Sequence, residues 1–278
     1  MNDLKLTPDD KKYLRKNGYL KNRVIAIANQ NGGVGKSTTA VNLSSYLGQF
    51  GFKTLIVDMD PQSNTTSGLG IIDISGKSSI YNVLISGENI LQVITKTQCG
   101  NLEAVPSSIQ LAGAEVELVT SMKREYKLKE AIDKYKKDYD YIVIDCPPAL
   151  GLLTINALSA ATEVIIPIQC EYYALEGLGQ LINTIKLVKE NLNPDLVIAG
   201  ALMTMYDQRI KLAEQVIVEV KKYFPDKVYK TIIPRNVRLS EAPSYGKPIF
   251  LYDPDCKGAK AYKSFTKEVI ENGTKRIG

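Results

Sequence analysis

The sequence predicts an α/β fold: a single domain with a mainly parallel, twisted sheet that helices cover on both faces. Short apolar runs alternate along the chain with longer, amphipathic segments. Continuous apolar strands interleaved with helices indicate a parallel sheet buried on both sides. The 278 residues contain no internal repeat and no linker rich in Pro, Gly or Ser. The alternation therefore belongs to one domain.

Seven segments fit buried strands, because each is a short run of mainly apolar residues. In chain order they are 24–29, 54–58, 102–105, 141–145, 163–168, 196–204 and 228–233. Helix-like segments lie between them at 36–50, 110–137, 151–160, 172–193 and 209–224. Ligands of such sheets bind at the carboxyl ends of the strands, so we expect the functional residues there.

The N-terminus differs in character from the rest of the chain. Residues 1–22 are predicted to form a basic extension, and 23–278 the folded domain. Thr7 fits a helix N-cap and Pro8 the first helical position. One short helix near 8–17 and a loose basic arm are both compatible with this pattern.

The net charge is unevenly spread along the chain. It is +5 in total, and residues 1–23 contain seven basic residues against three acidic ones, a net of +4. The remainder is therefore nearly neutral, with a net of +1. Binding of a polyanion by the domain must come from a local group of basic side chains.

The composition excludes several classes of protein. There is no histidine, which excludes a Ser-His-Asp triad, a zinc site with histidine ligands and a histidine general base. The four cysteines form no CxxC pair, as is typical of a reduced cytosolic chain. No apolar run approaches the ~18 residues that a membrane span needs, and none before Val24 resembles a signal peptide. We therefore expect a cytoplasmic protein.

A glycine-rich segment, QNGGVGKST at 30–38, follows the first predicted strand and begins the first long helix. This is the position of a phosphate-binding loop, or P-loop, in which backbone N–H groups surround phosphate oxygens. Lys36 would contact the β- and γ-phosphates, Ser37 would bind Mg²⁺, and Thr38 would bond the α-phosphate. A glycine-rich turn with a chance lysine is the alternative, but GKST in this context favours a P-loop NTPase.

Acidic residues follow two of the other predicted strands. Asp145 ends YIVID, as expected of a residue that holds Mg²⁺ directly or through water, and Asp58 and Asp60 end TLIVD. A single aspartate at a strand end is often only a loop cap. Three of them at carboxyl ends, beside a P-loop, favour a site for a magnesium nucleotide.

The sequence resembles the ParA/Soj family of chromosome- and plasmid-partition ATPases, which belongs to the deviant Walker A class together with the MinD proteins. The matching blocks lie at 28–38, 57–70, 109–118, 139–158, 168–178 and 232–249. Together they span roughly 24–270, and the last two are specific to the Soj branch. The resemblance implies ATP and Mg²⁺ as ligands.

The resemblance also implies a role for individual residues. Asp60, Lys36 and the residue at position 31 would act in catalysis, with Asp60 orienting the attacking water. Ser37 would bind Mg²⁺, with Asp145 and Asp58 supporting its water shell. The ATP-binding residues would be Asn31, Gly32, Gly33, Val34, Gly35, Lys36, Ser37, Thr38 and, at the adenine, Pro234 and Asn236.

The function implied is an ATP-dependent DNA-segregation switch. ATP would join two copies of the chain in a sandwich dimer that binds double-stranded DNA non-specifically, through Arg209 and Arg238. A ParB-type partner would trigger hydrolysis, and the protein would be associated with the nucleoid. An isolated arginine is more often simply solvated, so the DNA contacts rest on the resemblance.

The chain departs from the family at one position. The family's signature lysine lies two residues after the Asn of ANQ, and this chain has Asn31 there. The lysine would reach the phosphates bound to the partner copy, as an arginine finger does in other P-loop enzymes. Asparagine carries no charge and has a shorter side chain, so we expect impaired hydrolysis.

Two other functions fit the same fold. A MinD-like, membrane-associated positioning ATPase would need a free apolar face on a C-terminal helix. Tyr262, Phe265 and Val269 have helical spacing, but such a stripe fits packing on the domain better. An iron–sulfur enzyme would need cysteines at a dimer face, whereas Cys146 and Cys170 fit small buried residues.

Overall fold

The computed structural model describes residues 22–72, 76–171, 175 and 177–275. The predicted extension 1–22, with its possible helix near 8–17, lies almost wholly outside the described residues. The boundary between the extension and the domain therefore stays a prediction.

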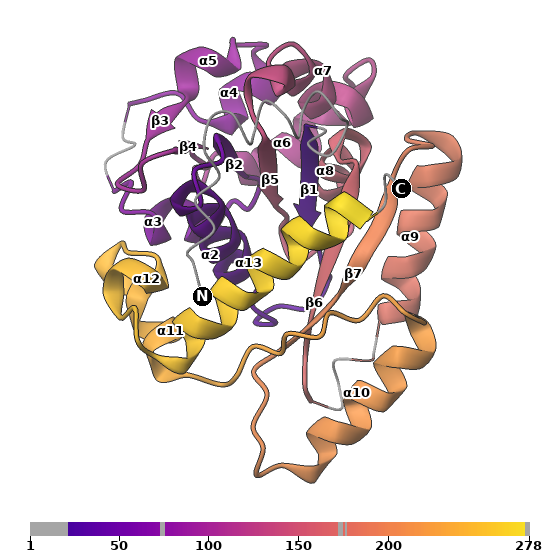
Figure 1. The fold of residues 1–278 in the computed structure, drawn as a ribbon. Coiled ribbons are helices and arrows are strands. Elements are labelled where there is room, and N and C mark those ends of the chain that lie inside the picture. Colours follow the sequence, from indigo (N-terminus) through magenta and orange to yellow (C-terminus); the bar gives the residue numbers. More distant parts are fainter. Residues whose placement is uncertain (1–21, 73–75, 172–174, 176, 276–278) are drawn as a thin grey trace.

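The described residues form one seven-stranded sheet, ordered β3-β4-β2-β5-β1-β6-β7 (Figure 1). All neighbouring strands are parallel except β3 and β4, which confirms the predicted fold class. The strands are β1 (Arg23–Ile27), β2 (Thr54–Asp58), β3 (Thr95–Lys96), β4 (Leu102–Val105), β5 (Tyr141–Asp145), β6 (Glu163–Gln169) and β7 (Val197–Thr204).

Helices of very different length connect the strands. The α-helices are α2 (Lys36–Gln49), α3 (Asn64–Gly68), α4 (Ile80–Ile85), α5 (Ile90–Val93), α6 (Leu111–Leu118), α7 (Lys127–Asp133), α8 (Leu152–Ala160), α9 (Leu178–Asn191), α10 (Lys211–Tyr223), α11 (Val237–Glu241), α12 (Ile249–Tyr252) and α13 (Lys257–Lys275). Short 3₁₀ turns are η1 (Arg124–Tyr126), η2 (Lys136–Asp138) and η4 (Ala242–Tyr245).

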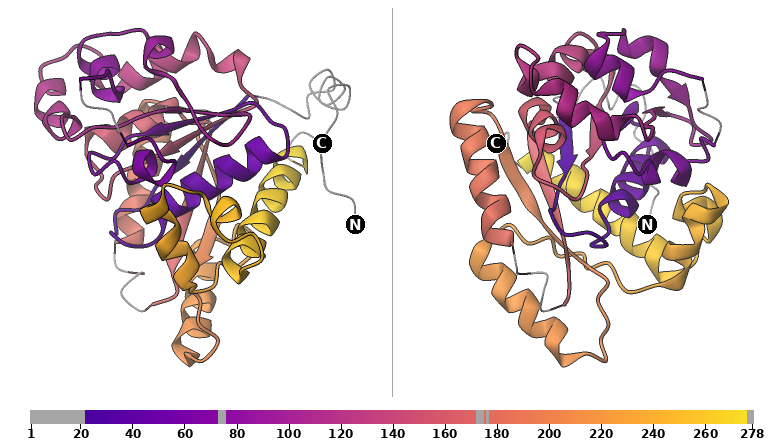
Figure 2. Two further views of the ribbon diagram at one scale, coloured as in Figure 1. Left: turned by 90° about the vertical axis from the view of Figure 1, so that its left-hand side faces the viewer. Right: turned by 180° about the vertical axis from the view of Figure 1, so that it is seen from behind.

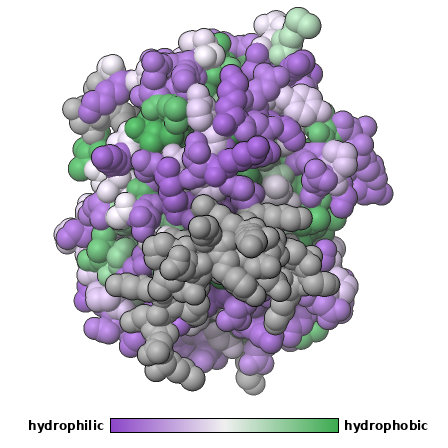
Figure 3. Space-filling view, turned by 45° about the horizontal axis from the view of Figure 1, so that its top comes forward, coloured by the Kyte–Doolittle hydropathy of each residue, from purple (hydrophilic) through white to green (hydrophobic). Residues whose placement is uncertain are grey.

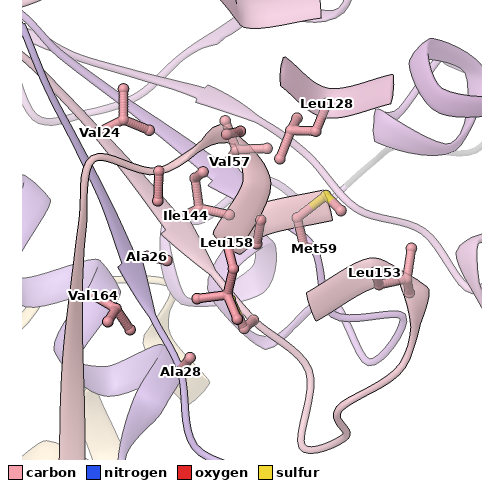
Figure 4. Packing of buried hydrophobic residues seen from close by; sticks show 14 of the residues in the cluster. Val24, Ala26, Ala28, Val57, Met59, Leu128, Ile144, Leu153, Leu158 and Val164 are labelled. Carbon is pink, nitrogen blue, oxygen red and sulfur yellow. The ribbon is translucent and has the colours of Figure 1, made fainter. Parts of the chain in front are cut away.

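Alternate residues of the buried strands enter two separate cores, one on each face of the sheet. On one face, Ile25 and Ile27 of β1 pack with side chains from α2 and α13, the two helices that lie in front of the sheet in Figure 1 and beside each other in Figure 2. On the other, Val24 and Ala26 pack among residues of α4 to α10, and Figure 4 shows part of that cluster. Both faces are covered, as predicted.

The predicted strand at 228–233 is wrong. An isolated bridge pairs Val228 with Ala201 of β7, and a second pairs Pro234 with Tyr206, just beyond the end of β7. The backbone N–H groups of Lys230 and Thr231 instead donate to the Glu268 carboxylate of α13, at 2.7 and 3.0 Å. Because those donors are diverted from the sheet, no regular ladder forms.

The helical predictions are confirmed in part. Long helices occur at α2, α8, α9 and α10. Of these, α2, α8 and α10 begin within two residues of their predicted starts, whereas the predicted start of α9, at 172, lies outside the described residues. The segment 110–137 is broken into α6, η1, α7 and η2, and Lys123 has φ of 52° at the break. Helices α3, α4 and α5 were not predicted, because they are four to six residues long and show too little periodicity.

The C-terminal apolar stripe packs on the domain, as expected. Tyr262, Phe265 and Val269 of α13 are all buried against the sheet. The end of the helix is tied to β1, because Arg23 Nη1 donates to the carbonyl of Val269 at 2.7 Å while the same guanidinium pairs with Glu163 of β6.

Three neighbouring strands place their carboxyl ends together. Asp145 of β5 is in register with Ile27 of β1 on one side and with Asp58 of β2 on the other. The chain leaving β1 forms the P-loop, so the glycine-rich segment and both aspartates meet at one edge of the sheet.

Candidate nucleotide site

The P-loop, residues 30–38, turns sharply between β1 and α2. Gly33 and Gly35 have φ of 73° and 89°, a left-handed region that glycine adopts without steric cost. Gly35 is the N-cap of α2, and Lys36 is its first residue. The loop therefore delivers backbone N–H groups to a helix N-terminus, which favours a bound anion.

Two side chains that sequence reasoning missed hold this loop in place. Asn29 Nδ2 donates to the carbonyl of Pro167 in β6 at 2.7 Å, and Asn29 Oδ1 accepts from the N–H of Asn31 at 3.0 Å. Thr204, at the end of β7, donates to the carbonyl of Val34 at 2.9 Å. Asn29 adjoins the motif and could have been suspected, but nothing in the sequence links Thr204 to it.

Lys36 is buried in the loop that it belongs to. Its Nζ donates to the carbonyl of Asn31 at 2.8 Å. Burial lowers the pKa of the Lys36 ammonium, while the carboxylates of Asp145 and Asp60 oppose that shift. Both backbone polar groups of Asn31 are thus used within the loop, its N–H by Asn29 and its carbonyl by Lys36.

The two strand-end carboxylates are buried side by side and have different partners. Asp58 accepts at both oxygens: Oδ1 from the N–H of Asp60 at 3.1 Å, and Oδ2 from the N–H and hydroxyl of Thr66 at 2.9 and 2.6 Å. Asp145 Oδ2 accepts from the Thr65 hydroxyl at 2.7 Å. Among the residues that the structure describes, no donor has hydrogen-bond geometry to Asp145 Oδ1.

Burial raises the pKa of both carboxyl groups. The nearby carboxylate of Asp58 raises the pKa of Asp145 further, and that of Asp60 raises the pKa of Asp58 further. The hydroxyls of Thr65 and Ser37 partly offset the shift at Asp145. A buried, repelled carboxylate with one unpartnered oxygen beside a serine hydroxyl is a donor set that suits Mg²⁺. Ser37 and Asp145 therefore fit the expected metal site.

A cavity of about 650 Å³ opens beside these groups. Its lining includes the P-loop residues Gly32, Gly33, Gly35, Lys36, Ser37 and Thr38. Asp60, whose Oδ1 accepts from the N–H of Gln62 at 2.9 Å, also lines it. Pro234 and Asn236 also line the cavity, although they lie nearly 200 residues from the P-loop in sequence. The structure thus brings most of the expected phosphate and adenine residues together around one cavity. Four of the expected nucleotide-site residues are not part of its lining: Asn31, Val34, Asp58 and Asp145.

Neither of the two arginines expected at DNA belongs to the lining of this cavity, and both already contact acids. The Arg209 guanidinium pairs with both oxygens of Asp207, at 2.9 and 2.6 Å. Arg238, in α11, pairs with Glu241 at 2.9 Å and with Asp253 at 3.4 Å. Both arginine side chains are exposed.

Comparison with known proteins identifies the family. A family model described as an AAA domain matches residues 22–198. The sporulation initiation inhibitor protein Soj of Bacillus subtilis is 58% identical over 90% of this chain and 99% of its own length. The chromosome partitioning protein ParA of Myxococcus xanthus is 52% identical over 91% of this chain and 89% of its own.

Solved structures support the same assignment. A cobyrinic acid a,c-diamide synthase from Mycobacterium smegmatis, crystallised with ADP and magnesium, superposes with a TM-score of 0.78. It is 39% identical and covers 88% of this chain and 92% of its own. The partition proteins are more similar in sequence than this neighbour. The chain therefore belongs to the ParA/Soj family of chromosome-partitioning ATPases, within the MinD/ParA superfamily.

Proposed function

We propose that this chain is an ATP-driven switch for DNA segregation, in which the ATP-bound form pairs two copies and binds double-stranded DNA without reading its sequence. The observation that carries the proposal is the convergence of the P-loop, Asp60 and Asp145 at one edge of the sheet. The similarity to proteins named for chromosome partitioning supports a role in DNA segregation.

Each group around the cavity has a chemical task in this proposal. Loop N–H groups and Lys36 bind the phosphates, with Lys36 exchanging the Asn31 carbonyl for phosphate oxygen. Ser37 and Asp145 would hold Mg²⁺, and the bound metal would neutralise charge on the β- and γ-phosphates. Asp60 orients the attacking water, and Pro234 and Asn236 contact the adenine.

DNA binding rests on charges that two copies would share. Arg209 and Arg238 would leave their acids for phosphates, and a symmetric pair of chains doubles the number of such contacts. Contacts of this kind give affinity without sequence preference. The protein would then be found on the nucleoid, where a ParB-type partner triggers hydrolysis and release.

Asn31 slows the ATP hydrolysis that would end the DNA-bound state. Its backbone is fixed within the P-loop by Asn29 and Lys36, and its side chain is an uncharged amide. It cannot supply a positive charge to the partner copy's phosphates. We therefore expect ATP·Mg²⁺ binding with very slow hydrolysis, even with DNA and partner present.

The structure gives little support to a membrane-associated function. The apolar residues of α13 are buried in the domain, and within the described residues no helix is both long and apolar enough to cross a bilayer. On the face drawn in Figure 3, hydrophilic residues predominate and hydrophobic ones form small groups between them. Cys146 and Cys170 are also buried, as expected of core residues.

The test is DNA binding as a function of nucleotide. Fluorescence anisotropy with a labelled duplex, and mass from light scattering, are measured without nucleotide, with ADP and with a non-hydrolysable ATP analogue. We expect DNA binding and a dimer mass only with the analogue, and equal affinity for duplexes of unrelated sequence. Equal DNA affinity without nucleotide, with ADP and with the ATP analogue would contradict the proposal.

A further inference from the structure

Helix α3 presents two adjacent threonines to two different carboxylates. Thr65 donates to Asp145 Oδ2 at 2.7 Å, and Thr66 donates to Asp58 Oδ2 at 2.6 Å. Both threonines are buried. The two acids therefore differ in how much of their hydrogen-bonding capacity the protein has already used.

At Asp58 both oxygens are occupied by the protein. Oδ1 accepts from the Asp60 N–H, and Oδ2 accepts twice from Thr66, through its N–H and its hydroxyl. A backbone N–H bound to a carboxylate is a charge-assisted bond that fixes the position of the backbone. Asp58 is thus tied to the loop that follows its own strand and to the helix beyond that loop.

The direction of the Thr66 hydroxyl is fixed. Its oxygen accepts from the backbone N–H of Ser107 at 2.9 Å. Because an N–H can only donate, the single hydroxyl proton of Thr66 must point at Asp58. The chain of bonds from Ser107 through Thr66 to Asp58 joins the segment after β4 to the end of β2.

These hydrogen bonds lie at the two ends of the loop that carries Asp60. The loop runs from β2 to α3 and contains Ser63, whose φ of 54° is unusual for a residue other than glycine. Its first anchor is the bond from the Asp60 N–H to Asp58, and its last is Thr66 on the same carboxylate. One buried carboxylate therefore closes the loop at both ends.

We propose that Thr66 and Asp58 are positioning residues for hydrolysis, and that their hydrogen bonds hold Asp60 at its place in the wall of the nucleotide cavity. This assignment rests on the proposed function and replaces the expectation that Asp58 supports the metal. Metal binding falls to Asp145, whose Oδ1 is unpartnered among the described residues. The two buried acids thus have different roles: Asp58 holds the loop, and Asp145 binds the metal.

The test compares two matched variants one residue apart. Thr66→Val removes the hydroxyl that bonds Asp58, and Thr65→Val removes the equivalent hydroxyl at Asp145. Thr66→Ser keeps the hydroxyl and is the rescue variant. Amide hydrogen exchange and affinity for a fluorescent ATP analogue with Mg²⁺ are measured on the full chain. Single-turnover ATP hydrolysis is measured with Asn31→Lys present in the parent and in every variant, so that the step is fast enough to compare.

For Thr66→Val we expect exchange at the amides of Asp60 and Ser107 to accelerate by about tenfold or more, since a bond to a charged group is removed. Single-turnover hydrolysis should fall by a similar factor because the loop is misplaced. Nucleotide affinity and exchange in β1 and β5 should not change. Thr66→Ser should behave like the parent, and Thr65→Val should leave the Asp60 amide protected.

Two results would overturn the inference. One is Thr66→Val with parental exchange at Asp60 and parental hydrolysis. The other is a Thr66→Val loss of Mg²⁺-dependent nucleotide affinity as large as that of Asp145→Asn, which would place Asp58 at the metal. Failure of the parent itself to bind the analogue with Mg²⁺ would instead overturn the proposed function.

Discussion

Replacement of Asp145 by asparagine should stabilise the nucleotide-free protein. Asp145 is fully buried beside Asp58, and burial and that neighbour raise its pKa to about 8 from an ordinary value near 4. The folded state therefore binds a proton more tightly than the unfolded chain. Stability is lost as the pH rises from about 4 through the raised pKa, because the carboxylate must then ionise in place.

The size of the gain follows from that shift. Each pKa unit corresponds to about 1.4 kcal/mol. Asparagine can still accept from Thr65, but its NH₂ group must find an acceptor in the site, and that requirement offsets part of the gain. We expect Asp145→Asn to raise the free energy of unfolding by about 2 kcal/mol at pH 8, or Tm by about 4–8 °C.

The assay is urea unfolding at pH 5 and pH 8 without nucleotide or Mg²⁺. The gain should be present at pH 8 and should disappear or reverse at pH 5, because the folded parent then keeps its carboxyl protonated and largely avoids the cost of ionising it in place. Asp138→Asn, an exposed acid on η2, is the matched control and should change little at either pH. A gain that is equal at both pH values, or a variant less stable than the parent at pH 8, would refute the reasoning.

Replacing Arg209 and Arg238 together with alanine should flatten the dependence of log K for DNA on log[salt] by about 0.9 for each DNA phosphate that the protein no longer neutralises; an unchanged slope would remove both from the DNA interface. Deleting residues 1–22 should weaken DNA binding and leave ATP affinity unchanged, whereas loss of ATP binding would make the extension part of the fold. Gly246→Ala should destabilise the protein by about 2 kcal/mol in thermal unfolding, because the new Cβ would lie 2.7 Å from Gly70 Cα at φ of 61°; a parental Tm would show that the two loops are not packed this closely.

The features of the fold that sequence could predict are those encoded by continuous patterns. Apolar runs such as 141–145 coincide with strands, and the P-loop lies between the first strand and the first long helix as predicted. A parallel sheet places the carboxyl ends of its strands at one edge, so the sequence predicted that Asp58 and Asp145 share that edge. That β2 and β5 are neighbours is known only from the structure. The prediction for 228–233 was wrong because Glu268, far along the chain, accepts from its amides.

The supporting residues of the site could not be predicted in the same way. Thr204 bonds the carbonyl of Val34 from 170 residues away, and Ser107 reaches Thr66 across 41. Such bonds depend on which loops the completed fold brings together. Thr66 lies within the family-like block 57–70, but the resemblance assigns it no role. In a five-residue helix, periodicity does not distinguish it from a solvated threonine.

The central claim is that Asn31 leaves an intact ATP-binding switch with a disabled hydrolytic step. The direct measurement is ATP turnover of this chain and of Asn31→Lys, each alone, with DNA, and with DNA plus a ParB-type partner. An arginine finger, which stabilises the transition-state charge, contributes ~10³–10⁵ in rate in other P-loop enzymes. We predict that both proteins bind ATP·Mg²⁺ and that only Asn31→Lys gains turnover from DNA and partner. Equal stimulated turnover by the chain as it stands would contradict the account.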